Sequence, residues 1–112
     1  MTTRHCFALD LKNDSDLINE YKRLHQPNMV WAEIIDSIKV AGIETLDIYL
    51  VGNRLFMVMD VNDQFCFSRK QSMDNSNLKV VEWETLMWKF QQRLPWAEPG
   101  EKWLPMEKIF TL

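Results

Sequence analysis

Residues 46–59 read Leu-Asp-Ile-Tyr-Leu-Val-Gly-Asn-Arg-Leu-Phe-Met-Val-Met, two alternating apolar runs joined by Gly52 and Asn53. A two-residue Gly-Asn link between such runs predicts a tight antiparallel hairpin, and its length determines which residues pair. One face then carries only aliphatic and methionine side chains, from the pairs Leu50–Leu55, Ile48–Met57 and Leu46–Met59. The other face places Tyr49 opposite Phe56 and is also too apolar to face water. We therefore expect helices over the first face and a second sheet against the other.

The segment before the hairpin predicts one strand and two helices. Residues 4–11 alternate between two faces, as in a strand. Capping residues at 13–15 begin a helix that ends by Gln26, because the residue before Pro27 is disfavoured in the helical conformation. A second apolar helical repeat runs from Trp31 to Ala41, and Gly42 is a fitting end for it.

The segment after the hairpin predicts a long helix and a closing strand. Residues 65–73 form a short helix or an irregular turn. Capping residues at 75–77 begin a helix that extends to about Leu94, with a core stripe made of Val80, Trp83, Met87, Phe90 and Leu94. Trp88 lies well away from that stripe. After a loop containing Pro95, Pro99 and Gly100, residues 105–112 close the chain as a strand.

This order of elements predicts the fold class. It is α+β, the ferredoxin-like split βαβ arrangement: a four-stranded antiparallel sheet with helices on one face. The chain of 112 residues has the size of one domain, so we assign residues 1–112 to a single unit. Because the second sheet face is apolar, we expect a homodimer packed sheet to sheet.

The composition limits the classes of partner that the chain is expected to bind. Five Trp, six Phe and seven Met are more than a small core needs, which indicates a self-association surface or an apolar ligand pocket. The net charge of −3 and the lack of a basic stripe argue against nucleic acid. We find no signal peptide and no membrane-spanning run, so the expected location is the cytoplasm. Two distant cysteines and two unclustered histidines predict neither a disulfide scaffold nor a metal site.

The candidate chemistry lies in residues 21–27, which read Tyr-Lys-Arg-Leu-His-Gln-Pro. Tyr21 and His25 are four residues apart on a helix and can point into one pocket. An imidazole exchanges protons near neutral pH, so beside a phenol it is a candidate acid/base group. The alternative is structural, because Leu17, Ile18, Tyr21 and Leu24 form an apolar stripe next to this histidine. On spacing alone the structural alternative is the stronger one.

Two motifs add a resemblance to a known family. Residues 20–25 read Glu-Tyr-Lys-Arg-Leu-His and residues 31–34 read Trp-Ala-Glu-Ile. Together they resemble the EYxRxH…WPE(L/V) signature of L-rhamnose mutarotases, and residues 106–110 look like that family's closing strand. The resemblance implies a dimeric α/β barrel that holds a monosaccharide between sheet and helices and needs no cofactor. It implies an isomerase that interconverts the anomers of a 6-deoxyhexose, L-rhamnose first, with L-fucose as the alternative.

The resemblance also assigns residues. The family's catalytic histidine falls on His25 and its helical substrate-binding tyrosine on Tyr21. A second family tyrosine falls on Leu46, and a Trp-Trp pair falls on Met87 and Trp88, so the surface that would grip the sugar departs from the family at two positions. Since a helix C-terminus favours a cation, we expect protonated His25 to act as proton donor to the ring oxygen, with Trp88 as a flat wall against the sugar.

Two other classes of function stay open at this point. The same fold could serve as a non-catalytic ligand-binding or dimerisation module, because fold does not dictate function. It could also be a cofactor-free oxygenase whose apolar pocket takes an aromatic substrate. The pair Tyr21 and His25, together with Trp88-Lys89-Phe90, favours the mutarotase, whereas Glu84 is expected to be a solvated helix residue.

Overall fold

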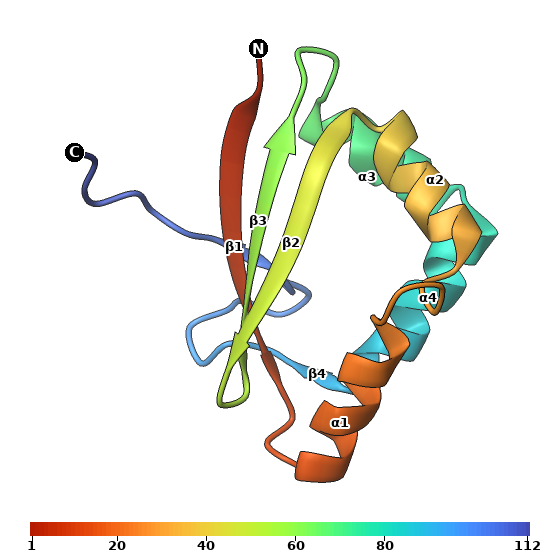
Figure 1. Cartoon of the computed structure of the whole chain (residues 1–112), viewed down its shortest axis with the longest axis vertical. Coiled ribbons are helices and arrows are strands. Elements are labelled where there is room, and N and C mark those ends of the chain that lie inside the picture. The colour runs from red at the N-terminus through yellow and green to blue at the C-terminus, as the bar shows by residue number, and fades with distance from the viewer.

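The computed structural model describes residues 1–112 and shows one antiparallel sheet with all its helices on one side (Figure 1). The strand order is β2-β3-β1-β4, and β5 also pairs with β1. The predicted α+β fold with helices on one face is confirmed, although the sheet has five strands and not the predicted four. In chain order the elements are β1 (Thr3–Leu11), α1 (Ser15–Leu24), α2 (Ala32–Val40), β2 (Ile43–Val51), β3 (Arg54–Val61), α3 (Phe67–Asn75), α4 (Leu78–Trp88), β4 (Gln91–Gln92) and β5 (Leu104–Pro105).

The central hairpin has the predicted register. β2 and β3 pair Leu50 with Leu55, Ile48 with Met57 and Leu46 with Met59. The turn is also attached to β1, because the backbone N–H of Leu11 donates to the carbonyl of Asn53 at 2.7 Å. The Asn53 amide nitrogen returns a bond to the Leu11 carbonyl at 2.9 Å. The hairpin is therefore held directly to the end of the strand that leads into α1.

The helices begin and end close to the positions that the sequence predicts. Asp14 caps α1 by accepting from the backbone N–H of Leu17 at 3.0 Å. Asn77 caps α4 by accepting from the two backbone N–H groups of Lys79 and Val80. Gly42 ends α2 with a positive φ of 98°, a conformation in which glycine is favoured.

Helix α4 is shorter than predicted, because it ends at Trp88 and not near Leu94. The chain then forms β4, in which Gln91 and Gln92 pair with Leu11 and Asp10 of β1. The free edge of β1 supplies backbone partners that compete with a further helical turn. Phe90 and Leu94 are buried as predicted, but Phe90 reaches the core from the turn before β4 and Leu94 from the loop after it.

The expected closing strand at 105–112 is also wrong in extent. Only Leu104 and Pro105 pair with β1, and the backbone N–H of Met106 makes one more bond, to the Cys6 carbonyl at 2.8 Å. Pro105 has no N–H to give to a ladder. The tail then leaves the sheet on the side away from the helices, with exposed Ile109, Phe110 and Leu112 (Figure 1). None of the helices combines the length and apolar character that crossing a bilayer requires.

The main core lies where α1 and α4 meet the sheet. Leu9, Leu11 and Leu55 are the largest fully buried side chains. Tyr21, Ile34, Val80, Trp83, Met87 and Phe90 join Leu11 and Leu55 in one cluster. A second, smaller cluster at the other end of the hairpin contains Ile43, Met59 and Val61. The space between sheet and helices is therefore filled at these clusters, and next to them it remains open as a cavity.

Candidate active site

A cavity of about 630 Å³ lies between the hairpin strands and the helices. This volume is within the usual range for small-molecule sites. Most of its lining is apolar, including Ile38, Leu46, Ile48, Met57 and Met59. The polar lining residues near α1 and α4 are Tyr21, His25, Glu84 and Gln91. A mostly apolar wall with a few polar groups suits a ligand that has both C–H surface and hydroxyl groups.

His25 sits at the C-terminal cap of α1, and its ring is oriented by its own helix. The Nδ1 atom lies 2.7 Å from the backbone carbonyl oxygen of Tyr21. A carbonyl can only accept, so Nδ1 carries a hydrogen and donates it. The imidazole also stacks against the Tyr21 ring, with centroids 4.3 Å apart, and meets Trp83 edge-on. These contacts leave Nε2 as the ring atom that is free to exchange protons.

The pKa of His25 is lowered from its ordinary value of 6.5, chiefly because the ring is buried. The hydrogen bond to the Tyr21 carbonyl raises the pKa, but by less. The imidazole is therefore neutral at pH 7. This is the opposite of the protonated donor expected from its place at a helix C-terminus, because loss of hydration outweighs the attraction of the helix end.

Tyr21 is buried on the cavity wall, and its hydroxyl reaches β4. The amide nitrogen of Gln91 donates to the Tyr21 hydroxyl oxygen at 3.3 Å. Burial raises the pKa of Tyr21 to about 12, with a smaller upward contribution from the negative charge of Glu84. Tyr21 therefore keeps its O–H proton at any physiological pH and can act as a hydrogen-bond donor.

The structure brings four of the five predicted site residues together. Tyr21, His25, Leu46 and Met87 all line the cavity, whereas Trp88 does not. Trp88 is 38% exposed at the end of α4, and the Lys102 ammonium lies 5.1 Å from its ring centroid. Neighbouring helical residues differ by about 100° in direction, so when Met87 faces the cavity Trp88 turns away from it. The expected aromatic wall is thus not at this position within one chain.

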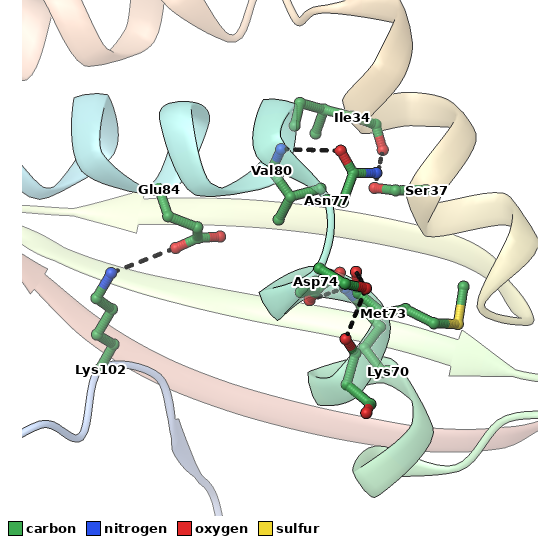
Figure 2. Close-up of polar contacts among 11 residues, drawn as sticks. Ile34, Ser37, Lys70, Met73, Asp74, Asn77, Val80, Glu84 and Lys102 are labelled. Atoms are coloured by element: carbon green, nitrogen blue, oxygen red, sulfur yellow. Dashed lines mark hydrogen bonds and ion pairs between the residues drawn. The ribbon is translucent and has the colours of Figure 1, made fainter.

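Two polar residues at the His25 end of the cavity, Glu84 and Gln91, were not among the predicted site residues. Glu84 lines the cavity and pairs with Lys102 at 3.4 Å, as Figure 2 shows, so it is not simply a solvated helix residue. It could have been found because it precedes Met87 by three positions on α4. Gln91 could not be placed correctly, because the helix was predicted to continue through it. Its position depends on the pairing of β4 with a strand 80 residues earlier, Leu11.

Comparison with known proteins places this geometry in a family. The model of the family described as L-rhamnose mutarotase matches residues 4–112. The chain belongs to the L-rhamnose mutarotase family. Membership makes it a sugar isomerase of the mutarotase type, in agreement with the prediction from residues 20–34.

Relatives of this L-rhamnose mutarotase family member are similar to it in sequence or in structure over nearly its whole length. It is 42% identical to an L-fucose mutarotase of Xanthomonas campestris, over 97% of this chain and 87% of the relative. It is 38% identical to a Dictyostelium discoideum protein of the UPF0734 group, over 94% and 86% of the two chains. The crystal structure of an L-rhamnose mutarotase from Formosa agariphila covers 98% of both chains with a TM-score of 0.69 and 23% identity. That last likeness supports the fold.

Proposed function

We propose that this chain interconverts the α and β anomers of a free 6-deoxyhexose in the cavity beside His25. The observation that carries the proposal is the neutral, oriented imidazole on the wall of a largely apolar cavity. Anomer exchange needs one group that takes and returns a proton near neutral pH. It needs no change of oxidation state.

The sugar we put first is L-fucose, with L-rhamnose second. The family signature alone favours L-rhamnose. The relative that is 42% identical over nearly the full chain is an L-fucose mutarotase, which supports the reverse order. Leu46 and Met87, which stand where the L-rhamnose pattern has a tyrosine and a tryptophan, are consistent with a different sugar preference.

The proposed reaction follows from the protonation of His25. The Nε2 lone pair accepts the proton of the anomeric hydroxyl, and the resulting imidazolium protonates the ring oxygen as the C1–O5 bond breaks. The aldehyde then rotates about C1–C2, and ring closure on the other face reverses both proton transfers. Atoms and charge balance, because the proton taken from O1 is the proton given to O5.

One imidazole is sufficient because both oxygens are bonded to the same carbon. The buried ring is attached to the Tyr21 carbonyl and stacked on the Tyr21 ring, so little reorganisation is needed. Positioned acid–base assistance is typically worth about 10²–10⁴ in rate. That is adequate for a reaction that also proceeds slowly in water.

We also propose that two chains form a homodimer through the outer sheet face, which no helix covers (Figure 1). Tyr49 is 59% exposed on this face. Phe56 and Val58 lie on the same face of the neighbouring strand, opposite Tyr49 and Asp47. A set of apolar side chains on one face of a sheet is a typical site of association.

The deciding experiment is saturation-transfer NMR on the anomeric protons of a panel containing L-fucose, L-rhamnose and their 6-hydroxy counterparts. The wild type should accelerate exchange of a 6-deoxy sugar, and His25→Ala should lose about 10²–10⁴ of that acceleration. His5→Ala is the matched control, because His5 is the only other histidine and, unlike His25, does not line the cavity.

Two outcomes would contradict the proposal in different ways. If the wild type accelerates exchange for no 6-deoxy sugar, the substrate class is wrong and a ligand-binding module becomes the better hypothesis. If His25→Ala exchanges sugars as fast as the wild type, the activity stands but the proposed base is wrong.

A further inference from the structure

Gln91 presents a buried amide at the polar end of the cavity. Its side chain lines the cavity although the residue is only 3% exposed. One end of the amide is used, because Nε2 donates to the Tyr21 hydroxyl oxygen at 3.3 Å. The other end, Oε1, is buried and has no hydrogen-bond partner within the protein, and it is the only buried side-chain nitrogen or oxygen atom in this condition.

Turning the amide around does not remove the mismatch. In the reversed orientation the Tyr21 hydroxyl would donate to Oε1, and Nε2 would then be buried without an acceptor. A buried polar atom without a partner is strongly unfavourable, and native proteins retain few of them. A ligand in the cavity that forms a hydrogen bond with this unpaired atom would therefore be stabilised by it.

The pair of residues presents a donor next to an acceptor. Because Gln91 Nε2 donates to the Tyr21 oxygen, the Tyr21 O–H proton remains available for another acceptor. Gln91 Oε1 in turn remains available for another donor. A hydroxyl group fits this arrangement, because its oxygen can accept a hydrogen bond from one neighbour while its O–H donates a hydrogen bond to the other.

On this geometry, and resting on the proposed function, we propose that Gln91 and Tyr21 together bind one ring hydroxyl of the sugar and so determine which sugar is accepted. The hydroxyl accepts from Tyr21 and donates to Gln91 Oε1. L-fucose and L-rhamnose differ in the orientation of the hydroxyls at C2 and C4, so a single bound hydroxyl is able to distinguish them. The apolar part of the cavity, which includes Leu46 and Met87, is then available to the C6 methyl group.

The test combines one substitution with one deleted hydroxyl at a time. Gln91→Met removes the amide while keeping the length of the side chain. Gln92→Met is the matched control, because Gln92 is the exposed neighbour on the same strand and does not line this cavity. Each variant is assayed by anomer exchange and by sugar binding, with the preferred sugar and its 2-deoxy, 3-deoxy and 4-deoxy analogues.

We expect Gln91→Met to lower kcat/KM for the preferred sugar by about 10–100-fold, as for a lost hydrogen bond that leaves a buried group unpaired. In the wild type, one deoxy analogue should show a loss of the same size. In Gln91→Met that analogue should lose less, relative to the preferred sugar, than it loses in the wild type, because only the Tyr21 bond to that hydroxyl remains to be lost. The other two analogues should lose the same factor in both proteins. Gln92→Met should behave as the wild type.

The inference is overturned if Gln91→Met keeps the wild-type kcat/KM, or if every deoxy analogue loses the same factor with and without the Gln91 amide. The second result would mean that Gln91 supports only the packing of the site, and an equal melting temperature of the two proteins would exclude unfolding as its cause. If the wild type exchanges and binds none of the sugars, the proposed function fails as well. Exchange in the wild type with an unaffected Gln91→Met refutes this inference alone.

Discussion

His25 is subject to two opposing influences that the chain places within one helical turn. Its burial favours the neutral ring, and the carbonyl of Tyr21 favours the charged ring. Burial is the larger effect, so the histidine is a base before the substrate arrives. The carbonyl contributes in another way, by holding the hydrogen on Nδ1 and leaving Nε2 unprotonated.

This balance predicts the pH dependence of the reaction. Because neutral His25 is the active form and its pKa lies below 6.5, kcat/KM should rise with pH below that value and be level above pH 7. Anomer-exchange NMR from pH 4.5 to 8.5, corrected for the uncatalysed rate, measures it. An activity that falls as the pH rises through the neutral range would show that the imidazolium is required.

The same pKa affects the stability of the fold. The unfolded chain binds a proton at His25 more readily than the folded chain does, so folding stability is lost as the pH falls below 6.5. His25→Gln lacks this group, and its stability relative to the wild type should improve between pH 7 and pH 5. Urea unfolding at the two pH values tests the sign.

At the residue scale, the acid/base pair could be predicted from spacing because it lies within one helix, whereas Leu46 and Met87 were predicted only through the family resemblance. Tyr21 and His25 are brought together by helical periodicity, which is readable from spacing. Gln91 joins them only because β4 pairs with β1, and no local pattern encodes that pairing. Trp88 was wrongly predicted to line the cavity. Its likeness to a family motif does not determine which of two adjacent residues faces inward.

Among the elements, the turn between α2 and β2 contains the one glycine that another segment approaches closely. Gly42 has a φ of 98°, and a Cβ atom there would lie 2.5 Å from the side-chain oxygen of Asn62 and 3.2 Å from the backbone nitrogen of Phe65. That oxygen is occupied, because it accepts from the backbone N–H of Gln64. The turn at the end of α2 therefore packs closely against the loop after β3.

We expect Gly42→Ala to destabilise the fold by more than the roughly 1–2 kcal/mol that the left-handed backbone alone costs. The control is Gly100→Ala, because Gly100 also has a positive φ, of 88°, but a Cβ atom there meets nothing within 4 Å. Chemical denaturation of both variants isolates the contribution of the close approach. Equal losses in the two would mean that the Asn62 side chain moves aside at no cost.

The elements themselves were predictable to the extent that their signals are local. The hairpin register follows from a two-residue turn, and α1 follows from Asp14 and Pro27. Helix α4 was predicted too long because Phe90 and Leu94 continue the apolar period of the helix. Both side chains are buried as predicted although neither residue is helical, since a side chain can reach the core from a turn or a loop as well as from a helix.

For the molecule as a whole, the two faces of the sheet have different roles. The inner face supplies the cavity wall, and the outer face carries Tyr49, Phe56 and Val58 beside two ion pairs, Arg4–Asp60 and Arg54–Asp10. Apolar side chains flanked by charges are the usual composition of a protein–protein interface. The topology could be predicted because each face is encoded by alternation, whereas the course of the C-terminal tail could not, since nothing local holds it to the sheet.

The proposed dimer predicts that charge on the outer face separates the chains. Tyr49→Asp should shift the protein from dimer to monomer in sedimentation velocity. Val40→Asp should leave the dimer intact, because Val40 is similarly exposed, at 66% against 59% for Tyr49, but lies on α2 on the other side of the sheet. A wild type that sediments as a monomer at all accessible concentrations, or equal behaviour of the two variants, would refute the interface.

Strand β4 contains only two residues, and they pair with the last two residues of β1. Short elements at a sheet edge open far more often than the core does. In the closed state of this edge Gln91 is hydrogen-bonded to Tyr21, which lies on the buried face of a helix, and in an open state the two would separate. A sugar that bonds to both would bind the closed state selectively and so stabilise it by mass action. Substrate recognition and the local folding of this edge would then be a single equilibrium.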